Sequence, residues 1–288
     1  MWLVYALASA FFAGLMSILA KIGIKNTDSN LATALRTIVV VVFAWIMVFI
    51  VGSQATLVQI ETKSLVFLIL SGLATGGSWL CYFRALQIGD INKVVPVDKS
   101  STVLTMLLAF LFLGEGLTFP KVIAMVLIGL GTYLMIEKTN AEATGTKGFR
   151  WLVYAILSAV FASLTAILGK VGIAGVEANL GTAIRTVVVL LMAWLIVFIQ
   201  GKHHEIRRID RRSGVFISLS GLATGASWLC FYRALQEGPA SVVVPIDKLS
   251  ILITITFGYI VLHEKLKKKP IFGLLMIVLG TLGLVFLV

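Results

Sequence analysis

Charged residues are scarce in this chain of 288 residues. They make up 13% of the sequence, whereas hydrophobic residues make up 59% and the mean hydropathy is +1.03. In soluble domains, charged residues account for about a quarter of the composition. This balance excludes an ordinary soluble domain and indicates a protein whose surface faces lipid.

Cysteine and histidine are also rare, with two and three residues. Cys81 and Cys230 fall within apolar stretches, where cysteine packs as a small apolar residue. The histidines fall in hydrophilic loops without a cysteine or carboxylate cluster, so we expect no metal site and no cofactor. The apolar stretches contain no paired histidines and no nucleophile–base spacing, which argues against an enzyme.

Long hydrophobic runs dominate what the sequence contains. A membrane-spanning helix needs about 20 apolar residues. The first half has five such stretches, and shifting them by 149 positions gives five more in the second half; the first five cover 2–23, 30–51, 64–88, 92–113 and 119–137. The sequence therefore predicts an all-α membrane protein with ten transmembrane helices.

The second half repeats the first. Residues 2–139 align without a gap to 151–288, with about 63 identical positions, and the motifs WLVYA, SGLATG and RALQ each occur twice. We expect a first five-helix repeat at 1–139, a linker at 140–150 and a second repeat at 151–288. Because each repeat crosses the membrane an odd number of times, the second must be inverted relative to the first (5+5).

Loop charges support this inversion. The loop at 52–63 has one basic residue, whereas its equivalent at 201–212 has five, namely Lys202, Arg207, Arg208, Arg211 and Arg212. Lysine and arginine accumulate in cytoplasmic loops, so equivalent loops are expected on opposite sides. Applied to the whole chain, this rule places both termini outside. The basic residues that give the net charge of +11 lie in the loops and spans, so this charge does not indicate a nucleic-acid partner.

The segment from the third to the fifth span of each repeat resembles a known family. These segments read WLCYFRALQIGDINKVVPVDKSSTVLTMLLAFLFLGE and WLCFYRALQEGPASVVVPIDKLSILITITFGYIVLHE. They are similar to the ten-helix EamA-type members of the drug/metabolite transporter (DMT) superfamily. The resemblance implies two inverted five-helix repeats around a central pathway for small metabolites. The sequence departs from the family in two ways. Its termini are expected outside the cell, whereas those of the family are usually cytoplasmic, and it has His263 at a position where the family has glycine.

Ionisable residues inside the spans are the candidates for a binding site. Each costs roughly 2.5 to 3.5 kcal/mol on insertion scales, so such residues usually face protein or water. Two tryptophans on the glycine-rich third and eighth spans are candidate cavity walls. The complete set of candidate substrate-binding residues is Arg36, Trp79, Arg84, Asp98 and Lys99 in the first repeat and Arg185, Trp228, Arg233, Asp247 and Lys248 in the second.

Each candidate also has a structural interpretation. Arg36 and Arg185 lie shallow enough to reach lipid phosphates, and Asp98 and Asp247 follow a proline closely enough to cap a helix. For the functional interpretation, we expect Asp98 to pair with Arg84 and Asp247 to pair with Arg233, which leaves Lys99 and Lys248 available. The formal excess of four positive charges predicts a cavity that prefers a carboxylate or phosphate.

The preferred function is a secondary transporter that moves a small polar metabolite, an amino acid or organic anion, by alternating access. Protons are a candidate coupling ion. The alternative is a flippase for a lipid-linked phosphate, which would need a side opening to the bilayer. The duplication makes a monomer sufficient, and a dimer stays compatible with the sequence. The expected location is the inner or plasma membrane of a prokaryotic cell.

Overall fold

The computed structural model describes residues 1–23, 27–88, 94, 97–135, 150–261 and 268–287, and within these residues it is helical without strands. Eight stretches are long and apolar enough to cross a membrane, and a shorter apolar helix covers Phe119–Leu134. The predicted linker at 140–150 lies outside the described residues except for Arg150, which begins a helix. The described chain is therefore an all-helical membrane protein.

The helices of the two repeats correspond to each other along the chain. The first repeat contains α1 (Trp2–Gly23), α2 (Ser29–Val51), α3 (Thr62–Ile88), α5 (Ser101–Leu113) and α6 (Phe119–Met135). The second contains α7 (Arg150–Gly172), α8 (Ala178–Ile199), α9 (Arg211–Glu237), α10 (Ala240–Lys248), α11 (Ser250–Val261) and α12 (Lys268–Leu287). Short 3₁₀ helices, η1 (Ser53–Gln59) and η2 (Lys202–Arg208), follow α2 and α8.

Capping residues explain where several of these helices begin and end. Asp28 accepts hydrogen bonds from the first amides of α2, and its equivalent Glu177 accepts one from the amide of Leu180 in α8. Gly52 and Gly201 follow the ends of α2 and α8 with φ of +77° and +66°, a conformation that favours glycine. The same local signals therefore start and stop equivalent helices in both repeats.

A turn interrupts the predicted ninth span, although Ala240–Phe257 is still long and apolar enough to cross a membrane. α10 ends at Lys248 and α11 begins at Ser250, and in the fourth span a turn at Ser100 likewise precedes α5. Between α10 and α11 the chain makes a tight turn, in which the amide of Leu249 bonds to the carbonyls of Ile246 and Asp247. Pro245 lies inside α10 and provides no amide for a helical bond, which weakens the helix just before the break.

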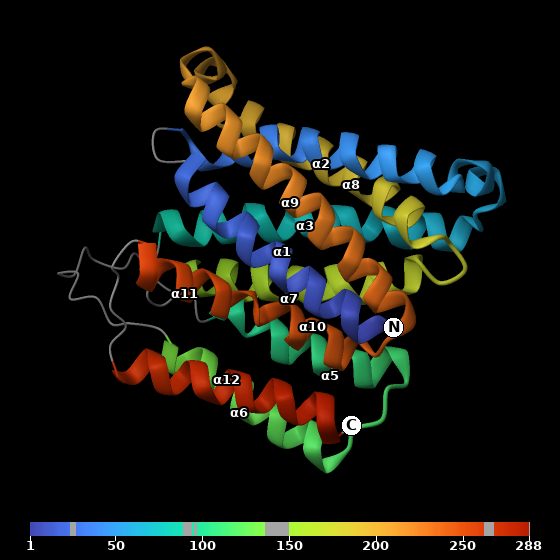
Figure 1. The fold of residues 1–288 in the computed structure, drawn as a ribbon, viewed down its shortest axis with the longest axis vertical. Coiled ribbons are helices and arrows are strands. Elements are labelled where there is room, and N and C mark those ends of the chain that lie inside the picture. Colours follow the sequence, from blue (N-terminus) through green and yellow to red (C-terminus); the bar gives the residue numbers. More distant parts are fainter. Residues whose placement is uncertain (24–26, 89–93, 95–96, 136–149, 262–267, 288) are drawn as a thin grey trace.

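The main helix pairs join one repeat to the other. α1 is antiparallel to α9, because Trp2 lies against Gly238 and Gly23 lies against Ile217. α3 is antiparallel to α7 in the equivalent way, with Ser78 bonded to Ser158. Figure 1 shows these pairs, with both chain ends at the same end of the helices. The bundle is thus held together by contacts between the repeats.

Two further pairs consist of a helix and its own equivalent. The start of α2 packs with the end of α8, where Leu31 and Val197 share a buried cluster, and Val48 and Leu180 share another at the opposite ends. α6 and α12 are also antiparallel, as Figure 1 shows. These equivalent helices therefore run in opposite directions through the molecule.

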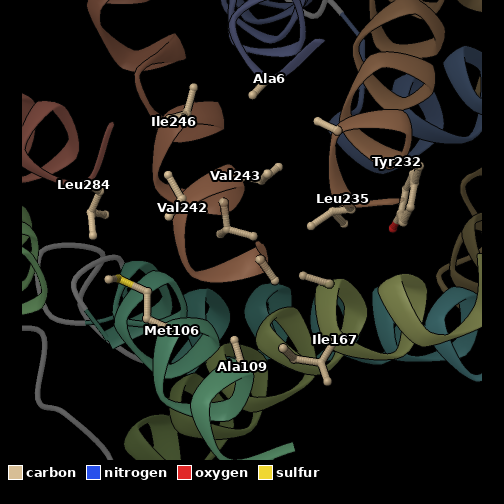
Figure 2. Packing of buried hydrophobic residues seen from close by; sticks show 14 of the residues in the cluster. Ala6, Met106, Ala109, Ile167, Tyr232, Leu235, Val242, Val243, Ile246 and Leu284 are labelled. Carbon is tan, nitrogen blue, oxygen red and sulfur yellow. The ribbon is translucent and has the colours of Figure 1, made fainter. Parts of the chain in front are cut away.

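The largest apolar cluster surrounds α10. Figure 2 shows Val242, Val243 and Ile246 of this helix among Met106 and Ala109 of α5, Ile167 of α7 and Leu235 of α9. All of these side chains are buried. The cluster fixes one half of the broken span between helices from both repeats.

Glycines spaced four apart on α3 and α9 lie at close helix contacts. A Cβ atom at Gly72 would lie 2.7 Å from Cβ of Val188 on α8, and one at Gly221 would lie 2.7 Å from Cβ of Val39 on α2. The contacts are equivalent and cross between the repeats. Close approach of these helix pairs requires glycine.

We predict that Gly221→Ala lowers the stability of the purified protein by about 1–3 kcal/mol, because the added methyl group overpacks the contact with α2. Gly214→Ala on the same helix is the matched control, since no atom lies within 4 Å of the added Cβ. The control should match or exceed the parent in melting temperature, because alanine favours helix over glycine. Equal melting temperatures for both variants would contradict the close contact.

Candidate functional site

Two adjoining cavities of about 360 and 320 Å³ lie between the repeats. We call them together the central cavity, because they share the wall residues Ser78, Trp79, Lys99, Ser101, Ala162 and Lys248. Hydroxyl groups make much of the wall, including Thr75, Thr105, Thr165, Thr224 and Ser227. The result is a polar chamber inside an apolar helix bundle.

Eight of the ten predicted site residues line the central cavity. They are Arg36, Trp79, Asp98, Lys99, Arg185, Trp228, Asp247 and Lys248. Arg84 and Arg233 are not among the described wall residues of these two cavities. Four basic and two acidic side chains thus leave a formal excess of two positive charges, which is smaller than the four that the sequence suggested.

The two aspartates bind serines of the opposite repeat. Ser158 on α7 donates a hydrogen bond to Asp98 at 2.6 Å, and Ser9 on α1 donates one to Asp247 at 2.6 Å. These serines are equivalent residues, and both are fully buried. Each aspartate is therefore fixed across the repeat interface at the point where the span breaks.

The predicted pairing of Asp247 with Arg233 is wrong. Arg233 Nε lies 2.6 Å from the carboxylate of Glu237, one turn further along α9. Asp247 instead approaches Lys248 at 3.7 Å, in addition to its bond with Ser9. A partner four residues away in the same helix is available without any tertiary arrangement, which explains why Arg233 uses it.

Arg185 is sealed in the protein interior, with 2% of its surface exposed. Its Nε donates to Ser71 at 2.9 Å and its Nη2 to Thr75 at 2.5 Å, both on α3. Its guanidinium carbon lies 5.1 Å from the ring centre of Trp228 and 4.6 Å from that of Tyr232, both on α9. Cation–π contact and hydrogen bonds thus hold this charge inside the bundle.

Arg36, the equivalent residue in the first repeat, has a different environment. It is half-buried on α2, and its Nη1 points to the sulfur of Met16 at 3.2 Å. Thioether sulfur is a weak hydrogen-bond acceptor. The structure is therefore asymmetric, with Arg36 accessible at one end of the central cavity and Arg185 covered at the other.

The comparisons with known proteins agree with this architecture. The model of the EamA-like transporter family matches residues 1–137 and again 149–286. The chain belongs to the EamA-like transporter family. This confirms the resemblance noted in the sequence and identifies the protein as a transporter.

Two relatives of this EamA-like transporter are also named as transporters. An "Uncharacterized transporter in cobO 3'region" from Sinorhizobium sp is 46% identical over 132 residues, which cover 46% of this chain and 94% of the relative. That relative therefore has about the length of one repeat. An "Uncharacterized transporter" from Archaeoglobus fulgidus is 24% identical over 260 residues, covering 90% of this chain and 89% of the relative.

A solved structure described only as "Crystal structure of protein" has a similar fold. Its TM-score is 0.78 at 15% sequence identity, and the alignment covers 99% of this chain and 96% of that one. At this identity the likeness shows the fold alone. The EamA-like transporter is an integral, multi-pass membrane protein, and its bacterial relative supports the plasma membrane as its location.

Glu115 closes the end of the transporter at which Arg185 is covered. Its two carboxylate oxygens accept hydrogen bonds from the amides of Ala240 at 2.6 Å and Ser241 at 3.0 Å, at the start of α10. Lys170 at the end of α7 lies 3.6 Å from the same carboxylate and donates to the carbonyl of Gly238. One carboxylate from the first repeat thus caps a helix of the second and neutralises a nearby lysine. We call this group the Glu115 clasp.

Sequence reasoning missed the residues that hold the charged groups in place. Ser9, Ser71, Thr75 and Ser158 are ordinary small residues in apolar helices, and only their recurrence at equivalent positions in both repeats set them apart. Their role depends on which helices of the two repeats pair, and the sequence does not state that pairing. Glu115 follows the end of a predicted span, but the sequence does not show its partners on α10 and α7.

We predict that Glu115→Ala lowers the free energy of unfolding by about 1–2 kcal/mol, because two amides at the start of α10 lose their cap. Glu115→Gln should lose less, since its amide oxygen can still accept one of these bonds. Glu237→Ala is the matched control and should cost at most about 0.5 kcal/mol, because it breaks only a partly exposed pair within one helix. Denaturation of the purified protein measures all three, and equal losses for Glu115→Ala and Glu237→Ala would refute the clasp.

Proposed function

We propose that this transporter is a carrier with ten membrane-crossing segments in two inverted repeats, which moves a small organic anion or amino acid by alternating access. The antiparallel course of α2 and α8, and of α6 and α12, supports the inversion. The opposite charge of equivalent loops supports it independently. Helix pairs that cross between the repeats allow one repeat to move against the other around a shared site.

The observation that carries the substrate class is the charge of the central cavity. Four basic side chains and two acidic ones line it, and each aspartate already accepts a hydrogen bond from a buried serine. In the described part of the chain, Lys248 lies 3.7 Å from the carboxylate of Asp247, and Lys99 also interacts electrostatically with Asp98 and Asp247. A ligand with a carboxylate or phosphate supplies the missing negative charge.

Lys99 and Lys248 are the proposed central contacts for this anion. They are equivalent residues at the breaks of the fourth and ninth spans, and both belong to the shared wall of the two cavities. Non-helical backbone at membrane depth is tolerated where it lines a cavity, and transporters often bind their substrates at such breaks. Asp98 and Asp247, beside these lysines, are the candidates for proton coupling.

The asymmetry of the two ends supports alternating access. The Arg185 end is closed by the Glu115 clasp and by aromatic rings over the guanidinium. The other end reaches Thr33 near the start of α2 and Tyr82 near the end of α3. If the first repeat adopted the arrangement now present in the second, and the second that of the first, one end of the central cavity would open while the other closed.

We predict that anionic metabolites raise the melting temperature of the detergent-purified protein, because a ligand that binds the folded state stabilises it by mass action. The panel contains amino acids, dicarboxylates, sugar phosphates, organic cations and a short-chain phosphatidic acid. Lys99→Ala and Lys248→Ala should weaken the apparent affinity for the stabilising anion by about tenfold or more. Lys63→Ala, at the exposed start of α3, is the control and should leave the affinity unchanged.

Stabilisation by cations or neutral compounds alone would contradict the proposed substrate class. Stabilisation by the phosphatidic acid but by no soluble anion would favour the flippase instead.

A further inference from the structure

Arg36 and Arg185 are equivalent cations at opposite ends of the central cavity, and neither has a carboxylate partner among the described residues. A buried charge without a counter-ion costs several kcal/mol. Nη1 of Arg185 is buried and forms no hydrogen bond at all. A purely structural role therefore leaves the charges of both arginines without a counter-ion and Nη1 of Arg185 without a hydrogen bond.

The hydroxyls beneath Arg185 do not depend on it. Ser71 donates to the carbonyl of Thr165 at 2.7 Å, and Thr75 donates to the carbonyl of Ser71 at 3.0 Å. Their remaining lone pairs accept from the guanidinium. Removal of Arg185 would leave both hydroxyl donors bonded, so the arginine is not needed to satisfy them.

An equivalent pair of hydroxyls is present for Arg36. Ser220 donates to the carbonyl of Ile217 and Thr224 to that of Ser220, both at 2.7 Å, so each hydroxyl keeps a free lone pair. Ser220 and Thr224 on α9 are the equivalents of Ser71 and Thr75 on α3. Arg36 contacts Met16 instead of this pair in the present structure. The fold thus contains an equivalent pair of hydroxyls for each arginine, and among the described contacts only Arg185 binds its own pair.

We propose that Arg36 and Arg185 bind the same oxyanion group of the transported molecule in turn, each while its own end of the central cavity is open. This inference rests on the proposed function and adds two specificity-determining residues to it. In the present conformation Arg36 is the available anchor, and Arg185 rests on its hydroxyl pair under Trp228 and Tyr232. When the opposite end opens, Arg36 moves onto Ser220 and Thr224, and Arg185 becomes available. The oxyanion is a carboxylate or a phosphate.

The test uses matched probes that differ only in the oxyanion. Succinate and succinamide form one pair, and glycerol 3-phosphate and glycerol form the other; the pair that shows a charge effect identifies the group. Apparent affinity comes from the melting temperature against probe concentration. Exchange is measured as the flux of the labelled binding probe across proteoliposomes that contain the full chain.

We expect Arg36→Gln to weaken binding of the charged probe by about tenfold or more, because a charge-assisted bond is lost at the open end. Arg185→Gln should keep binding within about twofold of the parent but slow exchange by about tenfold or more. Without a probe, Arg185→Gln should melt close to the parent, because Ser71 and Thr75 keep the hydrogen bonds that they donate and no ion pair is broken. Arg208→Gln, in η2, is the control for both measurements.

Three results would overturn the inference. The first is exchange by Arg185→Gln at the rate of the parent. The second is that Arg36→Gln binds the charged probe like the parent while Lys99→Ala loses this binding; in that case the proposed function survives. The third is a combination of two results. Arg185→Gln without a probe melts far below the parent or fails to fold, and Arg185→Lys, which keeps the charge, exchanges like the parent. Absence of any anion effect on the parent protein would instead refute the proposed function itself.

Discussion

The polar faces of each repeat are covered by the other repeat, and the rest of the structure depends on this mutual covering. In lipid, hydroxyl and charged groups must find their partners inside the protein. Ser78 meets Ser158, Ser9 meets Ser227, and Arg185 on α8 meets Ser71 on α3. Glycine and other small residues on α3 and α9 let the helices approach closely enough for such short side chains to reach each other.

The two repeats carry nearly the same polar groups but use them differently in this structure. The guanidinium of Arg185 lies on a pair of hydroxyls, while the equivalent pair near Arg36 is left without it. The Glu115 clasp joins the repeats at one end of the molecule. The asymmetry between the repeats therefore lies in how equivalent polar groups are used, and this observation supports the proposed alternation between them.

Much of this arrangement was predictable from composition and repetition. Apolar stretches of sufficient length identified the membrane helices, and the family resemblance is confirmed. Charged residues inside the spans identified six residues of the cavity wall, because charges in lipid are tolerated mainly where they face protein or water.

The failures have physical causes too. Glu237 follows Arg233 by one helical turn, so the sequence contains this local pair, and the expectation of a tertiary partner overlooked it. The serines that bind Asp98 and Asp247 come from the opposite repeat, and no local pattern reveals such a contact. The break at Leu249 lies four residues after Pro245, which signals a disturbed helix without fixing where the turn forms.

The central claim is that the two repeats cross the membrane in opposite directions, and cysteine labelling tests it most directly. Val58 is 93% exposed, and Arg207 is its exposed equivalent in the second repeat. Val58→Cys and Arg207→Cys would each be placed in a protein whose Cys81 and Cys230 are replaced by alanine, and intact cells would be treated with a membrane-impermeant maleimide. The account predicts that one of the two cysteines reacts in intact cells and the other reacts only after the membrane is opened. Reaction of both from the same side would contradict it.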